Sequence, residues 1–297
     1  MTLHLGRRAF ATVSAATATA ALLSVAFLSS ADAASTTRSA SASIPHPIRC
    51  AAPGHKAVTV VFVHGAWADS SSWNGEVRRL QQAGCPVRAA DNPVEDLNTD
   101  SQKVAALVRT IDGPVLLVGH SYGGSVITNV GAQAPNVVGL VYVDAFAPAV
   151  GEPASKLGGA TSAIATTPPA QVFQQIPGAP SGSSWMILRK KFFREHFASD
   201  LSTAQADQLW ATQTIASSGA LDTPSKYAAW KTLPAWYFLS TGDQIITPQA
   251  QRAQATRANA HITVFRGGSH LTLISHPDAV TGVIAKALSG VTASPTS

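Results

Sequence analysis

The chain of 297 residues has few charged side chains, only two cysteines and no long run of one charge. Charged residues make up 12% of it, against a usual share of about 25% in soluble domains. Hydrophobic residues make up 45%, which excludes a long disordered chain. The net charge is +5, but the basic residues are spread along the chain and form no stripe for nucleic acid. We therefore expect a small neutral or mildly anionic molecule as partner, and no nucleic acid.

The motifs of metal and nucleotide sites are also missing. The sequence has no C-x-x-C pair, no H-E-x-x-H motif and no glycine-rich phosphate loop between a strand and a helix. We therefore expect chemistry that uses no cofactor and no metal. After residue 28 the sequence has no apolar run long enough to cross a bilayer.

The one long apolar run lies at the N-terminus. Arg7 and Arg8 precede an alanine-rich stretch over Ala9–Leu28, and Ala31-Asp32-Ala33 offers a small-x-small cleavage site. This pattern predicts a signal peptide over residues 1–33 and a secreted mature chain. The arginine pair resembles a twin-arginine export signal; a plain basic segment is the alternative. A membrane anchor is a further alternative, but the many Ala, Thr and Ser residues are poor at spanning a bilayer, so we expect no stable anchor.

Residues 34–56 are expected to be a leader segment, and residues 57–297 one α/β domain. In that domain apolar strands alternate with helical segments, which is typical of a mostly parallel sheet with helices on both faces. Strands are predicted over 57–63, 86–90, 115–118, 137–143, 235–240 and 261–265, and helices over 70–82, 99–111, 122–134, 248–258 and 277–288. Between about 147 and 233 this rhythm is lost, and we expect an inserted, mainly helical cap without a second sheet.

Within the predicted cap, residues 185–197 mix apolar and basic side chains at helical spacing. We interpret them as an amphipathic helix that buries its apolar side against the core. In the alternative interpretation, some of these side chains line an apolar pocket for substrate.

The sharpest motif is Gly119-His120-Ser121-Tyr122-Gly123-Gly124, a G-x-S-x-G pattern between a predicted strand and a predicted helix. Gly119 and Gly123 lack the Cβ atoms that would clash in so sharp a turn. The turn lifts the Ser121 hydroxyl above the sheet and aims the first amides of the helix at the same point, which favours developing negative charge. We interpret Ser121 as a nucleophile, with a glycine-rich packing turn as the alternative.

A serine nucleophile needs a base and a carboxylate that orients the base. His270 follows the last predicted strand and is the candidate base, whereas His64 is interpreted as ordering the loop after the first strand. Asp243 and Asp144 each follow a strand, and both fit the order serine, acid, histidine. Either aspartate could instead be a turn residue or a helix cap. We favour Asp243, because its strand and the strand before His270 are consecutive and should be neighbours.

Two backbone amides are expected to bind the oxyanion of a reacting carbonyl group. One belongs to Tyr122, directly after the nucleophile. The other belongs to Ala66, because Gly65 lets the backbone approach closely there.

Taken together, these segments resemble an α/β-hydrolase over roughly residues 57–290. The segments are His64-Gly65-Ala66-Trp67, the Ser121 motif, Gly242-Asp243 and Gly267-Gly268-Ser269-His270. More narrowly, His64–Trp67 with Ser72-Trp73 is similar to the branch of plant methylesterases, hydroxynitrile lyases and their bacterial esterase relatives. The resemblance implies a serine esterase that cleaves small carboxylic esters through an acyl-enzyme. It also implies a Ser121–His270–Asp243 triad, with Asp144 as the alternative acid.

Three other functions on the same fold stay open: a cofactor-free perhydrolase, a cyanohydrin lyase and a non-catalytic binding protein. The lyases of this branch carry a lysine directly after the catalytic histidine, where this chain has Leu271. The residue type at this position therefore favours ester hydrolysis.

Cys50 and Cys85 each precede a strand, and in the family's sheet these two strands are neighbours. Export would place both thiols in an oxidising compartment, which favours a disulfide. Two buried free thiols are the alternative.

Overall fold

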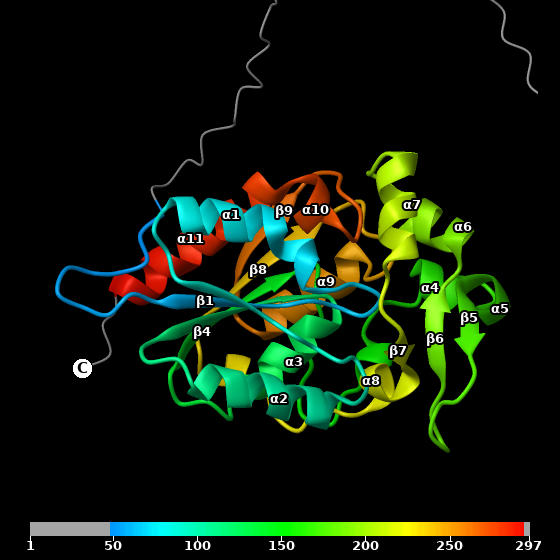
Figure 1. Cartoon of the computed structure of the whole chain (residues 1–297), viewed down its shortest axis with the longest axis horizontal. Coiled ribbons are helices and arrows are strands. Elements are labelled where there is room, and N and C mark those ends of the chain that lie inside the picture. Colours follow the sequence, from blue (N-terminus) through cyan, green and yellow to red (C-terminus); the bar gives the residue numbers. More distant parts are fainter. Residues whose placement is uncertain (1–47, 294–297) are drawn as a thin grey trace, which may run out of the picture. The chain divides into compact units, whose positions relative to one another are not determined.

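A six-stranded sheet organises residues 48–293, the part of the chain that the computed structural model describes (Figure 1). Its strands are β1 (Thr59–Val63), β2 (Val87–Ala90), β3 (Val115–His120), β4 (Val137–Val143), β8 (Ala235–Ser240) and β9 (His261–Phe265). They lie in the order β2-β1-β3-β4-β8-β9, and every pairing is parallel. The predicted α/β sheet is confirmed. The predicted signal peptide over 1–33 and the leader up to residue 47 lie outside the described residues.

The strands at the centre of the sheet are apolar on both faces. Every residue of β1 and β3 is buried, as continuous runs of Val, Leu and Phe predict for a sheet covered by helices on both sides. Because all six strands run in the same direction, their carboxyl ends meet at one edge of the sheet. Ser121, Asp144 and Asp243 all follow strands at that edge, which is where α/β sheets bind ligands.

Helices cover both faces of the sheet (Figure 1). On one face α1 (Asn74–Gln82) packs against α11 (Pro277–Ala293), and on the other α2 (Leu97–Arg109) packs against α3 (Tyr122–Val130). The helix α9 (Pro248–Arg257) lies against β8 and β9, and the short η1 (Ser70–Trp73) and α10 (Thr272–Ser275) precede α1 and α11. Among the described residues, no helix combines the length and the apolarity that crossing a membrane requires.

The segment between β4 and β8 holds short helices and a second sheet, on the right in Figure 1. The helical elements are η2 (Ala154–Lys156), α4 (Ala163–Thr166), α5 (Pro169–Val172), α6 (Lys190–Phe192), η3 (Phe193–Phe197), α7 (Thr203–Ala211), α8 (Ser218–Asp222) and η4 (Ala229–Lys231). The sheet consists of β5 (Phe173–Ile176), β6 (Trp185–Leu188) and β7 (Ala216–Ser217), paired antiparallel. The expectation that this insertion has no sheet is therefore wrong.

The expected helix over residues 185–197 is wrong for its first part, because residues 185–188 form β6. In β6, Met186 and Leu188 are buried while Trp185 and Ile187 are half-buried, which is the two-residue period of a strand. A run of four apolar residues fits a strand and a buried helix equally well. Pairing with β5 and β7 decides between the two, and the helix begins only at Lys190.

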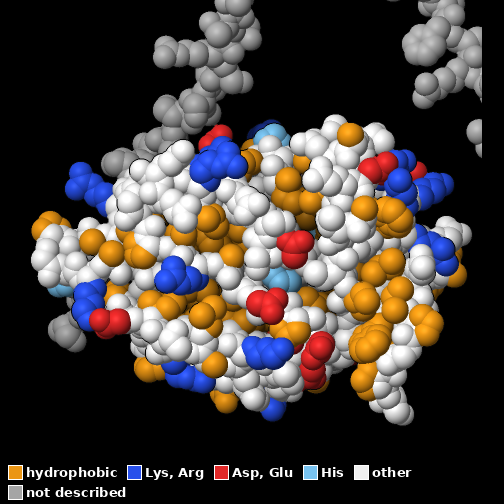
Figure 2. Space-filling model, in the orientation of Figure 1, with side chains coloured by type: hydrophobic (Ala, Val, Ile, Leu, Met, Phe, Trp, Pro, Cys, Tyr) orange, Lys and Arg blue, Asp and Glu red, His pale blue; other side chains and the backbone are white. Residues whose placement is uncertain are grey.

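A disulfide joins Cys50 to Cys85, with their Cα atoms 5.5 Å apart. The strands that follow these residues, β1 and β2, are parallel neighbours, so both cysteines lie at the same edge of the sheet, as expected. On the face shown in Figure 2, Lys and Arg side chains are scattered among acidic and uncharged ones and form no stripe.

Candidate active site

Ser121 lies at the sharp turn between β3 and α3. Its backbone has φ 51° and ψ −123°, a conformation that residues with a Cβ atom rarely adopt. A Cβ atom on Gly119 would overlap the backbone of Gly123, and one on Gly123 would overlap the carbonyl oxygen of Val63. Glycine at 119 therefore lets the chain turn tightly, and glycine at 123 lets the start of α3 lie close to β1.

The Ser121 side chain lines a cavity of about 480 Å³ beside the inserted segment. Most side chains in its wall are apolar, and the two charged residues are Lys156 and Asp222. The large apolar side chains are Trp67, Phe146, Ile164, Phe173, Met186, Leu221 and Ile245. An apolar cavity of this size with few polar groups is typical of a small-molecule site.

His270 and Asp243 form a buried pair at the same edge of the sheet. The Nδ1 atom of His270 donates to Oδ2 of Asp243 at 2.8 Å, and both side chains are inaccessible to solvent. The Nε2 atom of His270 is buried and has no hydrogen-bond partner within residues 48–293. Burial lowers the pKa of His270, so the ring is neutral and Nε2 can accept a proton. Its ring packs against that of His120, the neighbour of Ser121, with centroids 4.7 Å apart.

The carboxyl of Asp243 is surrounded by donors. Its Oδ1 atom accepts from the amides of Ile245 and Ile246 at 2.7 and 3.1 Å, and Oδ2 also accepts from Gln251 Nε2 at 2.8 Å. Burial raises the pKa of Asp243, and these three donors oppose that rise because they favour the charged form.

The alternative acid, Asp144, makes different contacts. Its Oδ1 atom accepts from the Ser240 amide at 2.7 Å, and its Oδ2 atom lies 2.9 Å from Ser240 Oγ. In the described part of the chain, no hydrogen bond joins Asp144 to His270. The fold therefore pairs the candidate base with Asp243.

His64 orders the loop after β1. The Asn92 amide donates to His64 Nε2 at 3.3 Å, so the ring proton lies on Nδ1, which donates to the carbonyl oxygen of Gly65 at 2.9 Å. A Cβ atom on Gly65 would lie 2.6 Å from that of Ser121, so only glycine allows this close approach.

Ala66, whose amide is expected to bind the oxyanion, lines the same cavity as Ser121. The amide of Tyr122 belongs to the first residue of α3, where no earlier helical turn supplies an acceptor.

Sequence reasoning missed three side chains that support this site. His120 Nε2 donates to the carbonyl oxygen of His270 at 2.8 Å, the hydroxyl of Tyr122 donates to Asp100 at 2.7 Å, and Gln251 contacts Asp243. His120 lies inside the serine motif, so that motif was a signal for it. Asp100 and Gln251 lie on helices whose sequences carry no such signal, and only the packing of α2 and α9 brings them to the site.

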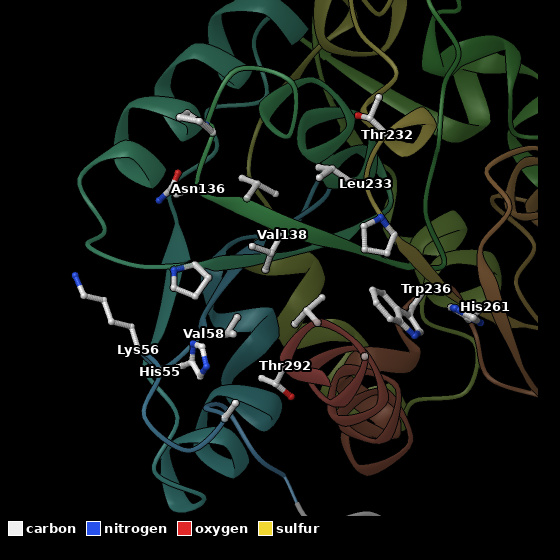
Figure 3. Close-up of a pocket in the computed structure, with 17 residues that line it drawn as sticks. His55, Lys56, Val58, Asn136, Val138, Thr232, Leu233, Trp236, His261 and Thr292 are labelled. Carbon is white, nitrogen blue, oxygen red and sulfur yellow. The ribbon is translucent and has the colours of Figure 1, made fainter. Parts of the chain in front are cut away.

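A larger cavity, of about 920 Å³, lies at the opposite edge of the sheet, where the strands begin (Figure 3). Its wall includes His55, Lys56, Trp236 and His261, and none of the residues predicted to act in catalysis. His55 and His261 are thus remote from Ser121.

Comparison with known proteins agrees with this architecture. The model of the alpha/beta hydrolase family matches residues 60–283. A carbendazim hydrolyzing esterase from Nocardioides sp. is 34% identical over 105 residues, which are 31% of this chain and 43% of that protein. This match thus spans less than half of the relative's length.

Solved structures with the same fold come from bacteria and plants. An extracellular alpha/beta-hydrolase from Paenibacillus is 21% identical with a TM-score of 0.63, covering 77% of this chain and 98% of that one. A pyrethroid hydrolase from Sphingobium faniae is 21% identical with a TM-score of 0.62, covering 80% and 98%. A methylesterase from Arabidopsis is 17% identical with a TM-score of 0.64, covering 78% and 99%. Because the family model matches residues 60–283, well over half of the 297, the chain belongs to the alpha/beta hydrolase family.

Proposed function

We propose that this chain is a secreted serine esterase that hydrolyses small carboxylic esters through an acyl-enzyme. The observation that carries the proposal is the buried His270–Asp243 pair, whose 2.8 Å hydrogen bond leaves Nε2 as the ring nitrogen available to a substrate-facing serine. Ser121 sits on the strained turn next to His120, whose ring packs against that of His270, and it lines an apolar cavity. In residues 48–293 no hydrogen bond joins Ser121 to Nε2, so the serine hydroxyl has to approach the base when substrate binds.

In the proposed reaction, Ser121 Oγ attacks the carbonyl carbon of the ester while His270 Nε2 takes the hydroxyl proton. The electron pair of the C=O bond moves onto oxygen, and the amides of Ala66 and Tyr122 donate to that oxyanion. When the oxyanion collapses, the alcohol leaves with the proton from Nε2, and the acyl group stays on Oγ. Water then repeats the attack with His270 as base, which releases the acid and restores Ser121.

Asp243 has an orienting role in this scheme. By accepting from Nδ1, its carboxylate keeps the ring in the tautomer that has a lone pair on Nε2, and it stabilises the imidazolium that forms. Asp144 is not given this role, since its carboxyl contacts Ser240.

The walls of the cavity favour an ester with an apolar acyl or alcohol group. Aromatic and branched side chains surround Ser121, and the charged Lys156 and Asp222 have opposite signs, so no net charge in the wall selects an ionic substrate. Relatives with this fold include a methylesterase and a pyrethroid hydrolase, and a curated relative is a carbendazim hydrolyzing esterase.

Ester hydrolysis is proposed over the other functions on two grounds. Leu271 follows His270 and is buried, so no ammonium group is available there to stabilise leaving cyanide. A binding protein would have no need of the strained serine turn. A perhydrolase would use the same residues, with peroxide in place of water.

Secretion is supported by the sequence pattern over residues 1–33 and by the disulfide between Cys50 and Cys85, since such bonds persist in oxidising compartments. Expression of the full chain in a bacterial host, followed by N-terminal sequencing of protein from the medium, tests this part. A mature chain that starts near residue 34 is expected, and an uncut chain retained in the cell would contradict secretion.

The catalytic proposal is tested by labelling the purified mature protein with a fluorophosphonate and by measuring hydrolysis of p-nitrophenyl esters of increasing chain length. We expect one label per chain, on Ser121, and no label on the Ser121→Ala variant. Label on another residue, or hydrolysis that survives in the variant, would contradict the proposal.

A further inference from the structure

Asp144 begins a chain of hydrogen bonds that ends in the loop carrying His270. Its Oδ2 atom lies 2.9 Å from Ser240 Oγ, and Ser240 Oγ lies 2.8 Å from Thr272 Oγ1. Thr272 Oγ1 in turn lies 2.6 Å from the carbonyl oxygen of Ser269. The end of β4, the end of β8 and the residues on both sides of His270 are thus joined through side chains.

The number of protons in this chain decides the state of Asp144. Three oxygen–oxygen contacts need three protons, but the two hydroxyls supply only two. The Ser269 carbonyl can only accept, so Thr272 donates its proton there, and Ser240 donates its own to Thr272. The contact between Ser240 Oγ and Asp144 Oδ2 then needs a proton on the carboxyl group.

We propose that Asp144 is a neutral carboxylic acid in the working enzyme and acts as a positioning residue for the His270 loop. Its Oδ2–H group donates to Ser240, while Oδ1 accepts from the Ser240 amide at 2.7 Å. One donor and one acceptor are what a protonated carboxyl presents. The proposal rests on the proposed function, because it assigns a role relative to the base.

The surroundings of Asp144 agree with a neutral group. Asp144 is fully buried, and no Lys or Arg pairs with it or with Asp243 within residues 48–293. Within residues 48–293 the titratable groups that act on it are Asp243, which is paired with His270, and Tyr237, whose hydroxyl donates to the carbonyl of Ala145. Burial raises the pKa of Asp144, and the negative charge of Asp243 raises it further.

The donors are divided unequally between the two carboxyls. Asp243 accepts from two amides, Gln251 and His270, whereas within residues 48–293 one backbone amide, that of Ser240, donates to Asp144. The Gln251 side chain also lowers the pKa of Asp144, but its hydrogen bond at 2.8 Å is made to Asp243. Two buried carboxyls close to each other do not both ionise. The negative charge is therefore placed on Asp243, where His270 needs it, and the proton on Asp144.

An asparagine offers a matched test. Its Nδ2–H group can donate to Ser240 Oγ and its Oδ1 can accept from the Ser240 amide, as the neutral acid does. Asp144 has φ 44°, a left-handed conformation that asparagine tolerates as well as aspartate does. Asp144→Asn should therefore keep the hydrogen-bond chain, whereas an ionised Asp144 would be poorly replaced.

We would measure kcat, KM and the pH profile of kcat/KM for five variants. Asp144→Ala removes both hydrogen bonds to Ser240 and should lower kcat by up to about 100-fold with KM unchanged, whereas Asp144→Asn, which restores them, should recover most of that loss with the wild-type pH profile. Asp243→Asn should lose about 10⁴-fold in kcat. Thr272→Val removes the last hydroxyl of the chain and should lower kcat by up to about 100-fold with KM unchanged, because the base shifts. Ser289→Ala, in α11 away from these contacts, controls for loss of a hydroxyl as such.

Infrared spectroscopy supplies a readout that does not depend on turnover. The difference spectrum of wild type minus Asp144→Asn at neutral pH should contain the C=O stretch of a buried protonated carboxyl. Taking the difference removes the band of Glu76, a second buried carboxyl whose pKa burial raises. If the band is present but no ester is hydrolysed, the proposed function fails and the protonation stands. The inference is overturned if the band is absent, if Asp144→Asn loses as much activity as Asp243→Asn, or if Thr272→Val has the wild-type kcat.

Discussion

The strained turn at Ser121 predicts that activity and stability can be separated by two substitutions at one position. The backbone there has φ 51° and ψ −123°, which costs a residue with a Cβ atom about 1–3 kcal/mol and costs glycine little. Ser121→Ala removes only the hydroxyl and keeps the strain. Ser121→Gly removes the hydroxyl and the strain together.

The expected difference between the two variants follows from opposing terms. Relief of strain stabilises the glycine variant by about 1–3 kcal/mol, while the larger freedom of glycine in the unfolded chain destabilises it by about 0.4–1 kcal/mol. The net gain is about 1 kcal/mol in the free energy of unfolding, which raises Tm by about 2–4 °C for a domain of this size. Both variants should lose about 10⁶-fold in kcat, as other serine hydrolases do without their nucleophile.

Urea and thermal unfolding of wild type, Ser121→Ala and Ser121→Gly, followed by circular dichroism, would measure the stabilities. Hydrolysis of a p-nitrophenyl ester would measure the activities, with the fluorophosphonate as a check for contaminating wild-type enzyme. We expect Ser121→Ala to unfold at the same temperature and urea concentration as wild type, and Ser121→Gly to unfold at a higher temperature and a higher urea concentration. A glycine variant no more stable than the alanine variant would refute the stored strain, and a tenth of wild-type activity in either would refute Ser121 as nucleophile.

Three further predictions concern the acid, the disulfide and the leaving group. Because burial raises the pKa of Asp144, the native state holds a proton that the unfolded chain releases, so this residue lowers stability as pH rises above the ordinary aspartate range. Urea unfolding between pH 4 and pH 8 would measure the free energy of unfolding of both proteins. The value for Asp144→Asn minus that for wild type should increase by up to about 1.4 kcal/mol per pH unit, and a difference that does not change with pH would contradict the raised pKa. The double variant Cys50→Ala, Cys85→Ala should have a free energy of unfolding about 4 kcal/mol lower than wild type, because the disulfide closes a loop with a sequence separation of 35 and this loop would become free in the unfolded chain. A loss below about 1 kcal/mol would show that the disulfide does not form in solution. Mandelonitrile should release no cyanide beyond the uncatalysed rate, since Leu271 carries no charge, and a cyanide-electrode signal that depends on Ser121 would overturn the assignment to ester hydrolysis.

Short-range patterns in the sequence were enough to predict the elements of the main sheet. Continuous apolar runs mark β1 and β3, and the glycines around Ser121 mark the turn that follows β3. The apolar runs and the contact between Gly119 and Gly123 involve residues within a few positions of each other, so they can be recognised in the sequence. The approach of Gly123 to Val63, in contrast, is made only in the folded sheet. The likeness of Gly119–Gly124 to a nucleophile turn therefore located the candidate serine before any tertiary contact was known.

The insertion shows where local patterns fail. Residues 185–188 are four apolar residues in a row, and such a run has no period that separates strand from helix. The partners that make them a strand, β5 and β7, come from residues 173–176 and 216–217. The hydrogen bonds that decide the structure are thus made to segments outside the run.

The choice between Asp243 and Asp144 also depends on the tertiary structure, because the hydrogen bonds that decide it are made to distant segments of the chain. Both follow parallel strands in the right order, so the sequence offered only an argument from neighbouring strands. The decisive contacts join His270 to Asp243 and Ser240 to Asp144, and both span long stretches of chain. The sequence by itself determined which side chains reach the carboxyl edge of the sheet. Their partners, and with them the protonation of two buried carboxyls, depend on donors from α9, β8 and the His270 loop that only folding brings together.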